Sequence, residues 1–241
     1  MKVGTKYWRK ATIVAVLAAM LLILSTAAVS AHNQNTGVYP IDSHPYGKSY
    51  GEWSAKWWQY AFSVTSFDKC VSDSSGNVWF LAGTADGSIA SRNCTVPEGK
   101  AILIPVFVVE WSDLEGACPL PDVNGNPIQG SDAKALRACA HAFAAHAYAS
   151  DATLKVQIDK TKLQDLKQYE AVSPYFPFTA VTGNLFGVPP GSGHSVADGF
   201  WIMLKPLCSG KHVVHFEATV PFPDLHFTFT TGATYNLTIR D

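Results

Sequence analysis

The chain has 241 residues, of which 47% are hydrophobic, 12% aromatic and 15% charged. This composition is too apolar for a disordered chain, and the length is short for several ordinary domains. Eighteen basic and 19 acidic residues give a formal net charge of −1, so we expect no nucleic-acid partner and no electrostatic attraction to an anionic membrane.

Residues 1–31 are predicted to be a secretory signal peptide. Basic residues precede an apolar run over 11–24, and small residues over 25–31 place the expected cut after Ala31. The apolar run is shorter than the ~20 residues that a membrane-spanning helix needs. No later stretch is long and apolar enough to span a bilayer. We therefore expect residues 32–241 to be secreted, to the periplasm or outside the cell, as one soluble domain.

An aromatic amphipathic helix is predicted over 50–63. Ser49 and Glu52 have the spacing of a capping box, in which each side chain bonds the backbone N–H of the other residue. Trp53 and Trp57 recur at helical spacing, so we expect them in the core.

The remaining elements are predicted to be mostly short strands. Segments rich in β-branched and aromatic residues alternate with turns that contain Gly and Pro, and one Ala-rich helix interrupts them. The helix is expected at 131–148, the strands at 77–82, 100–111, 153–158, 175–181, 199–204, 211–220, 225–230 and 233–239, and a flexible connection at 189–193. This order predicts a mainly β fold, an antiparallel β-sandwich or jelly roll with two helical insertions.

Cysteine usage agrees with export, because an oxidising compartment allows disulfides. Spacing alone does not determine the pairing of the five cysteines. We favour Cys70–Cys94 and Cys118–Cys139, each closing a loop that contributes ~3 kcal/mol in the chain-entropy description. Cys208 is then left over and is expected to be a buried thiol.

Four segments resemble a group of secreted bacterial proteins of unassigned function. These are YGEWSAKWWQYA (50–61), VWFLAGT (78–84), CTVPEGKAILIPV (94–106) and VADGFWIMLKPLCSGKHVVHF (196–216). The resemblance implies an exported bacterial protein with a β-rich domain. It supplies no activity, cofactor or catalytic residue.

Aromatic residues give the first functional hypothesis. Exposed indole and phenol rings stack on sugar rings, so Trp58, Tyr60, Trp79 and Trp111 are candidate ligand-binding residues. The alternative is that these rings pack in the core. We expect a non-enzymatic secreted module, without a cofactor, that binds a polysaccharide or another envelope component.

A copper-dependent oxidase is one alternative. Cleavage after Ala31 would make His32 the first residue, and an N-terminal histidine can bind copper through its amino group and imidazole. That arrangement resembles lytic polysaccharide monooxygenases. It would make the protein a secreted enzyme that acts on a polymer.

A two-carboxylate hydrolase is the other enzymatic alternative. Glu52, Glu110 and Asp198 each lie beside aromatic residues, and a glycosidase needs two such acids across a cleft. Each acid also has a structural explanation: Glu52 completes the helix cap, Glu110 ends a strand and Asp198 belongs to a turn.

The histidines give no metal site by spacing. His212 and His215 are three apart on a predicted strand and point to opposite faces, with His212 expected in the core. His141 and His146 are five apart on a predicted helix, which differs from the i, i+4 spacing of a helical metal site.

Overall fold

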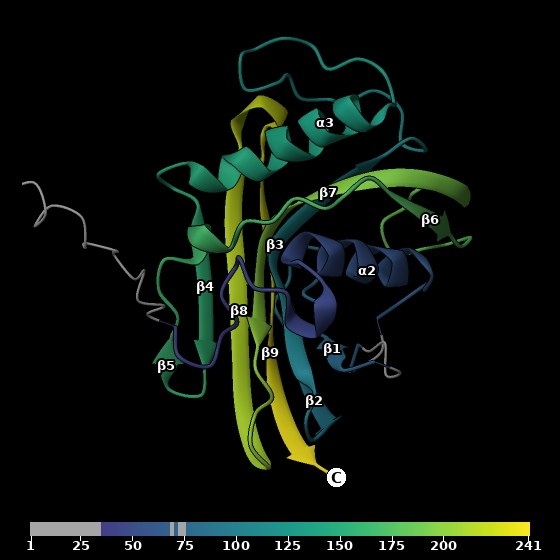
Figure 1. The fold of residues 1–241 in the computed structure, drawn as a ribbon. Helices are drawn as coiled ribbons and strands as arrows, with labels where there is room; N and C mark the ends of the chain where they lie inside the picture. Colours follow the sequence, from purple (N-terminus) through teal and green to yellow (C-terminus); the bar gives the residue numbers. More distant parts are fainter. Residues whose placement is uncertain (1–34, 68–69, 72–75) are drawn as a thin grey trace, which may run out of the picture. The chain divides into compact units, whose positions relative to one another are not determined.

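Two β-sheets and two α-helices build the described part of the chain (Figure 1). The structure is a computed structural model and describes residues 35–67, 70–71 and 76–241. Residues 35–241 form one compact unit. The expected signal peptide at 1–31 and His32 lie outside the described residues. The signal peptide and the role of His32 as a copper ligand therefore stay predictions.

The strands form two sheets that contact each other through β3 of one sheet and β4, β8 and β9 of the other. The four-stranded sheet has the order β1 (Val78–Phe80), β3 (Ala101–Ser112), β7 (Gly191–Leu204) and β6 (Phe176–Ala180). The five-stranded sheet has the order β2 (Ala90–Pro97), β9 (Phe227–Arg240), β8 (Gly210–Phe222), β4 (Thr153–Ile158) and β5 (Thr161–Lys162). All neighbouring strands are antiparallel except β1 with β3 and β2 with β9, which are parallel.

Helix α2 (Tyr50–Phe62) covers β6 and β7. Its predicted capping box is present: Ser49 Oγ accepts a bond from the Glu52 N–H at 3.2 Å, and the Glu52 carboxylate accepts one from the Ser49 N–H at 2.7 Å. This cap fixes the start of α2 and directs its aromatic side chains onto the sheet. None of the helices in the described ranges is long and apolar enough to cross a membrane.

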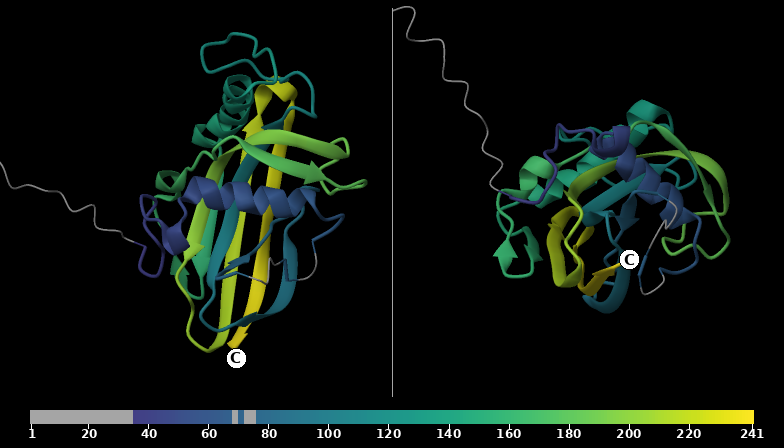
Figure 2. Two further views of the ribbon diagram at one scale, coloured as in Figure 1. Left: turned by 45° about the vertical axis from the view of Figure 1, so that its right-hand side comes forward. Right: turned by 60° about the horizontal axis from the view of Figure 1, so that its bottom comes forward.

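Helix α3 (Ala133–Ala145) contacts β3 and β7 near the end of the sandwich where β8 turns into β9 (Figure 2). Its N-cap is Asp132, whose carboxylate accepts a bond from the Ala135 N–H at 2.8 Å. Short 3-10 helices complete the structure at Pro45–Gly47 (η1), His146–Tyr148 (η2), Leu166–Tyr169 (η3) and Pro223–Leu225 (η4).

The core follows the hydrophobic pattern of the sequence. In β8 every second residue from Val214 to Phe222 is buried, as in a strand with one face in the core. In β7 the run from Ser195 to Leu204 is wholly buried, because this strand lies between β3 and β6 and both α2 and α3 pack against it. The prediction of a mainly β sandwich with two helical insertions is confirmed.

Two segment boundaries predicted at glycines are wrong. The strands expected at 225–230 and 233–239 are one strand, β9, because Gly232 lets it pass close to β8: a Cβ there would lie 2.4 Å from the Phe216 carbonyl oxygen. The flexible connection expected at 189–193 is also wrong in part, since β7 already begins at Gly191.

Both predicted disulfides are confirmed. Cys70–Cys94 has a Cα–Cα distance of 5.3 Å and Cys118–Cys139 one of 5.8 Å. The second bridge fastens the loop before α3 to the middle of that helix. Cys208 carries the remaining thiol, but it is exposed and not buried as expected, because it lies in the turn between β7 and β8.

Candidate functional site

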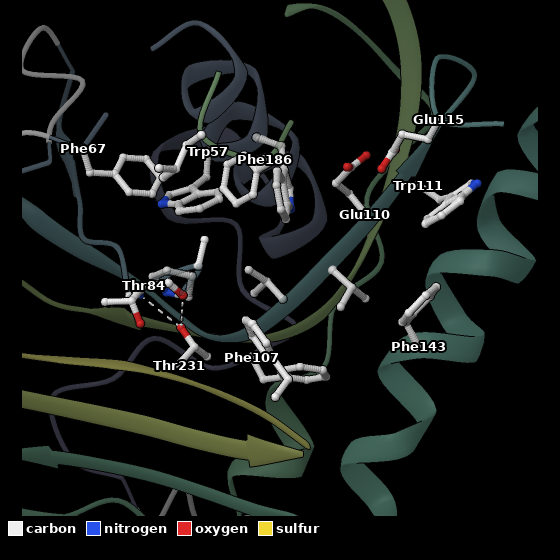
Figure 3. A pocket seen from close by; sticks show the side chains of 18 of the residues that line it. Trp57, Phe67, Thr84, Phe107, Glu110, Trp111, Glu115, Phe143, Phe186 and Thr231 are labelled. Atoms are coloured by element: carbon white, nitrogen blue, oxygen red, sulfur yellow. Dashed lines mark hydrogen bonds between the residues drawn. The ribbon is translucent and has the colours of Figure 1, made fainter. Parts of the chain in front are cut away.

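An aromatic cavity of about 370 Å³ lies between α2, β3, the C-terminal end of α3 and the β8–β9 turn (Figure 3). Thr84 and Thr231 lie at its wall, together with two glutamates. Its aromatic lining residues are Trp57, Trp58, Phe67, Phe107, Trp111, Phe143, Phe186, Phe222, Phe227 and Phe229. We call this space the aromatic cavity.

The aromatic walls are held by contacts within the protein. Trp57 donates its indole N–H to the Leu81 carbonyl at 2.8 Å and packs edge-on against Trp58, with ring centroids 5.1 Å apart. Trp111 stacks on Phe143 at 5.7 Å with an angle of 16° between the rings. The cavity is therefore formed without a ligand, which lowers the entropic cost of binding.

The carboxyl groups of Glu110 and Glu115 meet at one end of the cavity (Figure 3). Glu110 is 9% exposed, and the Ser195 hydroxyl lies 2.6 Å from one of its oxygens. Glu115 accepts bonds from the backbone N–H and the hydroxyl of Ser112, at 2.8 and 2.7 Å. The two carboxyl groups lie close enough for the charge of one to act on the other, so they form one polar unit in an apolar wall.

The surroundings shift the pKa values of Glu110 and Glu115 differently. Burial raises the pKa of Glu110 well above its usual value, and the charge of Glu115 raises it further. Burial also raises the pKa of Glu115, but the Ser112 donors oppose that shift. Glu110 therefore keeps a proton more readily, while Glu115 is better placed to carry a negative charge.

This arrangement is typical of a ligand site. Binding pockets are commonly apolar cavities of ~300–1,000 Å³ with a few convergent polar groups. Carboxyls with shifted pKa values also concentrate at functional sites. The cavity can enclose an apolar molecule, and the carboxyl pair can accept a hydrogen bond from it.

Two of the four predicted ligand-binding residues line the aromatic cavity, and the other two lie outside it. Trp58 and Trp111 line the aromatic cavity, but Tyr60 and Trp79 do not. Trp79 is buried and donates its indole N–H to the Cys70 carbonyl at 3.0 Å. Because Trp58 is also buried, the four rings form no flat exposed platform for a sugar chain.

The three candidate catalytic acids are not brought together. Glu52 is exposed at the helix cap, and Glu110 lies in the aromatic cavity. Asp198 is not in a turn, as expected, but is buried inside β7. The register pairs Val109 with Asp198 and Glu110 with Ala197, so the Glu110 and Asp198 side chains leave the sheet on opposite faces.

Two acids near the candidate residues were not predicted from the sequence. Glu115 pairs with Glu110 from a Gly-containing loop, where no spacing pattern indicates it. Glu170 lies with His141 and Asp198 in a group whose potential ligand atoms are all within 4.8 Å of one another. These three residues are the described side chains that could hold a metal ion.

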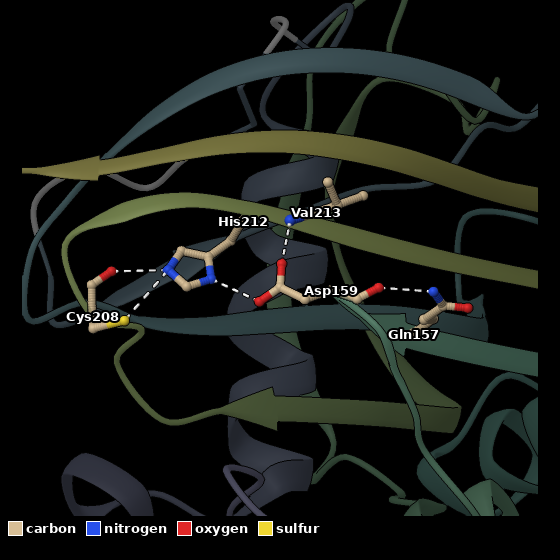
Figure 4. A network of polar contacts seen from close by, with 5 residues as sticks. All are labelled: Gln157, Asp159, Cys208, His212 and Val213. Atoms are coloured by element: carbon tan, nitrogen blue, oxygen red, sulfur yellow. Dashed lines mark hydrogen bonds and ion pairs between the residues drawn. The ribbon is translucent and has the colours of Figure 1, made fainter.

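His212 and Cys208 belong to a separate polar network near the β4–β5 turn (Figure 4). His212 Nδ1 lies 2.9 Å from an Asp159 carboxylate oxygen, and Nε2 lies 3.0 Å from the Cys208 carbonyl oxygen and 3.7 Å from its sulfur. The Asp159 carboxylate also accepts a bond from the Val213 N–H at 2.8 Å. His212 is only 12% exposed and is the register partner of buried Leu237, while both of its ring nitrogens have polar partners in this network.

Comparisons with known proteins place the chain in no family. No protein-family model matches the sequence, and no curated protein matches it. Among solved structures, a cysteine protease inhibitor, EhICP2, from Entamoeba histolytica is similar at 10% identity and a TM-score of 0.23, over 68% of this chain and 96% of that one. PbICP-C, solved in complex with falcipain-2, gives 10% identity and a TM-score of 0.23 over 68% of this chain and 99% of its own. Similarity at this level supports no inference about activity.

Proposed function

We propose that the protein is a secreted binding protein that takes a small, largely apolar molecule into the aromatic cavity. The ligand presents one hydrogen-bond donor, a hydroxyl or an amine, to the Glu110–Glu115 pair. The observation that carries this proposal is a preformed aromatic cavity with two neighbouring carboxyl groups at one end. Of the two ligand classes expected from the sequence, this favours an apolar envelope component over a polysaccharide.

The cavity wall supports an apolar ligand because it has few polar groups to offer. Thr231 donates its hydroxyl to the Thr84 carbonyl at 2.8 Å and accepts a bond from the Thr84 N–H at 3.2 Å. Those groups satisfy each other, whereas a polysaccharide needs many available donors and acceptors. A ligand that loses ~200 Å² of apolar surface gains roughly 5 kcal/mol before the cost of association.

Two observations support secretion. The two disulfides are typical of a protein that folds in an oxidising compartment. The sequence of residues 1–31 has the three-part composition of a signal peptide. An exported protein with an apolar cavity would meet molecules of the cell envelope or the surrounding medium.

A fluorescence titration with N-phenyl-1-naphthylamine tests the proposal. This neutral probe is apolar, carries one N–H donor and becomes fluorescent when it leaves water. We expect saturable binding that Trp111→Ala weakens at least tenfold, because this change removes a wall of the cavity. Trp53→Ala is the matched control: Trp53 is also half-buried, but it lies outside the cavity and bonds the Pro45 carbonyl.

A second variant tests the carboxyl pair. Glu115→Gln removes the negative charge, and we expect roughly tenfold weaker binding of the same probe, since hydrogen bonds to charged groups contribute ~1.5–3 kcal/mol. Absence of saturable probe binding would contradict the proposal. So would an equal loss of binding in Trp111→Ala and Trp53→Ala.

A further inference from the structure

Three side chains able to bind metal come together beside α3 from distant parts of the sequence. They are His141 on α3, Glu170 directly after η3 and Asp198 in β7, with potential ligand atoms within 4.8 Å of one another. We propose that these residues bind one divalent transition-metal ion, with Zn²⁺ as the best fit. We call this group the α3 cluster; it is independent of the aromatic cavity proposal.

Backbone contacts fix the two acids of the α3 cluster next to each other. The chain after η3 runs along β7, where the Ala171 N–H bonds the Gly199 carbonyl at 2.8 Å and Glu170 forms a bridge with Phe200. Asp198 therefore has Glu170 as a neighbour across this pairing. Helix α3 contacts β7 on the same side and supplies His141.

Buried oxygen atoms without hydrogen-bond partners favour the binding of a cation at the α3 cluster. The Asp198 side chain is 0% exposed, and only its Oδ2 is bonded, to His141 Nδ1 at 2.9 Å. Its Oδ1 has no hydrogen-bond partner in the structure. Glu170 repeats the pattern: Oε2 accepts a bond from the Tyr148 hydroxyl at 2.6 Å, whereas Oε1 is buried without a partner. Buried carboxylates are normally paired or bound to metal, because an unpaired buried charge is costly.

The donor set selects a transition metal. One imidazole nitrogen and two carboxylates suit Zn²⁺, which commonly takes three protein ligands and one water. Bonds of about 2.0–2.1 Å to a tetrahedral ion place its ligand atoms about 3.3 Å apart. The observed 2.9 Å between His141 Nδ1 and Asp198 Oδ2 is close to that value, and the potential ligand atom of Glu170 lies within 4.8 Å of those of the other two residues. The Tyr148 hydroxyl then orients Glu170 from outside, as hydrogen-bond donors around metal ligands do.

Ions can reach the α3 cluster from solvent. The rest of the described chain contains no other comparable group of three potential metal ligands. The His141 side chain is 48% exposed, which opens a path from solvent to buried Asp198. Two other His–Asp contacts, His194 with Asp113 and His212 with Asp159, lack a second acid as a third ligand. No other group of three such side chains comes this close within the described residues.

Calorimetric titration of the chelator-treated protein with ZnCl₂ tests the proposal. We expect one Zn²⁺ per chain, and more than tenfold weaker binding in His141→Ala, Glu170→Gln and Asp198→Asn. Asp113→Asn is the matched control because it changes another His–Asp contact. His32→Ala separates this site from the N-terminal copper site of the alternative hypothesis. Both control variants should bind Zn²⁺ as the unchanged protein does.

Thermal unfolding with and without ZnCl₂ distinguishes lost binding from lost folding. Binding to the folded state alone raises Tm, so we expect a rise in the unchanged protein and in Asp113→Asn, but none in His141→Ala. Mn²⁺ should bind more weakly than Zn²⁺, following the usual order of metal affinities. Absence of Zn²⁺ binding, unchanged binding in His141→Ala, or tighter binding of Ca²⁺ than of Zn²⁺ would overturn the proposal.

Discussion

Two pairs of carboxyl groups lie against β3 and β7, and their surroundings differ. Glu110 and Glu115 lie beside each other and receive serine donors inside an apolar cavity. Asp198 and Glu170 each keep a buried oxygen without a partner, and an imidazole lies beside them. In both pairs burial raises the pKa of the deeper acid, Glu110 or Asp198. The first pair can be satisfied by a proton and the second by a cation.

The difference shows how donor placement decides what a buried acid pair can do. At the aromatic cavity, donors within the protein leave the pair ready to accept one bond from a ligand. At the α3 cluster, one buried oxygen of each acid has no hydrogen-bond partner, and the potential ligand atoms of the three residues lie within 4.8 Å of one another. Helix α3 touches both regions, since Phe143 lines the cavity and His141 belongs to the cluster.

Removing the Cys118–Cys139 bridge should have the largest effect, because it fastens α3. We expect Cys118→Ala with Cys139→Ala to lower the unfolding free energy by roughly 3 kcal/mol and to weaken Zn²⁺ binding as well. Removing Cys70–Cys94 by the same substitutions should cost similar stability without changing Zn²⁺ affinity. Denaturant unfolding and calorimetry of the two variants measure this, and equal loss of Zn²⁺ affinity in both would contradict the role of α3.

Glu110→Gln should change stability in a pH-dependent way. Because the pKa of Glu110 is raised in the folded state, the folded protein binds more protons than the unfolded chain above about pH 4.3, so stability falls as pH rises. Glutamine imitates the protonated acid and can donate to Glu115. We expect a gain of about 1 kcal/mol at neutral pH that disappears below about pH 4. Urea unfolding across this range checks it, and a pH-independent difference would contradict the assignment.

The Trp111–Phe143 stack should couple the cavity to α3 by a smaller free energy than the effects predicted above. A double-mutant cycle with Trp111→Ala and Phe143→Ala should give a coupling free energy of about 0.5–1.5 kcal/mol, as for other aromatic pairs. A coupling near zero would mean that α3 is not held by the cavity wall. A second cycle with Tyr60→Ala and Phe143→Ala serves as the control, because these two rings do not contact each other.

Cys208→Ser should have the smallest effect, because its exposed side chain touches neither carboxyl pair. We expect a stability change within about 0.5 kcal/mol and unchanged binding of Zn²⁺ and of the naphthylamine probe. The folded protein should also react with one equivalent of a thiol reagent at Cys208. Modification only after unfolding would contradict its exposed position.

Most of the fold could be predicted because its signals are local. The Ser49–Glu52 cap and the spacing of the tryptophans define α2, and alternation of buried residues defines β8 and the end of β9. Strand β2 (Ala90–Pro97) was not predicted, because only Cys94 and Val96 of its side chains are buried. It is held by its parallel pairing with β9, which no local pattern indicates.

The functional regions were only half predictable. Glu110, Asp198, Trp58 and Trp111 could be selected as carboxyls and rings among aromatic neighbours. Their grouping depends on which face of the sheet each side chain leaves, and therefore on the register of β3 with β7. Glu170 and His141 approach Asp198 only through tertiary packing of separate elements, so no spacing along the chain could indicate the cluster.

A crystal structure of the protein with N-phenyl-1-naphthylamine tests the central claim most directly. We predict electron density for the naphthyl ring between Trp57 and Trp111, with the amine at hydrogen-bond distance from Glu110 or Glu115. Density for the probe only on the outer surface, with the aromatic cavity free of it at saturating concentration, would contradict the assignment of the cavity as the binding site.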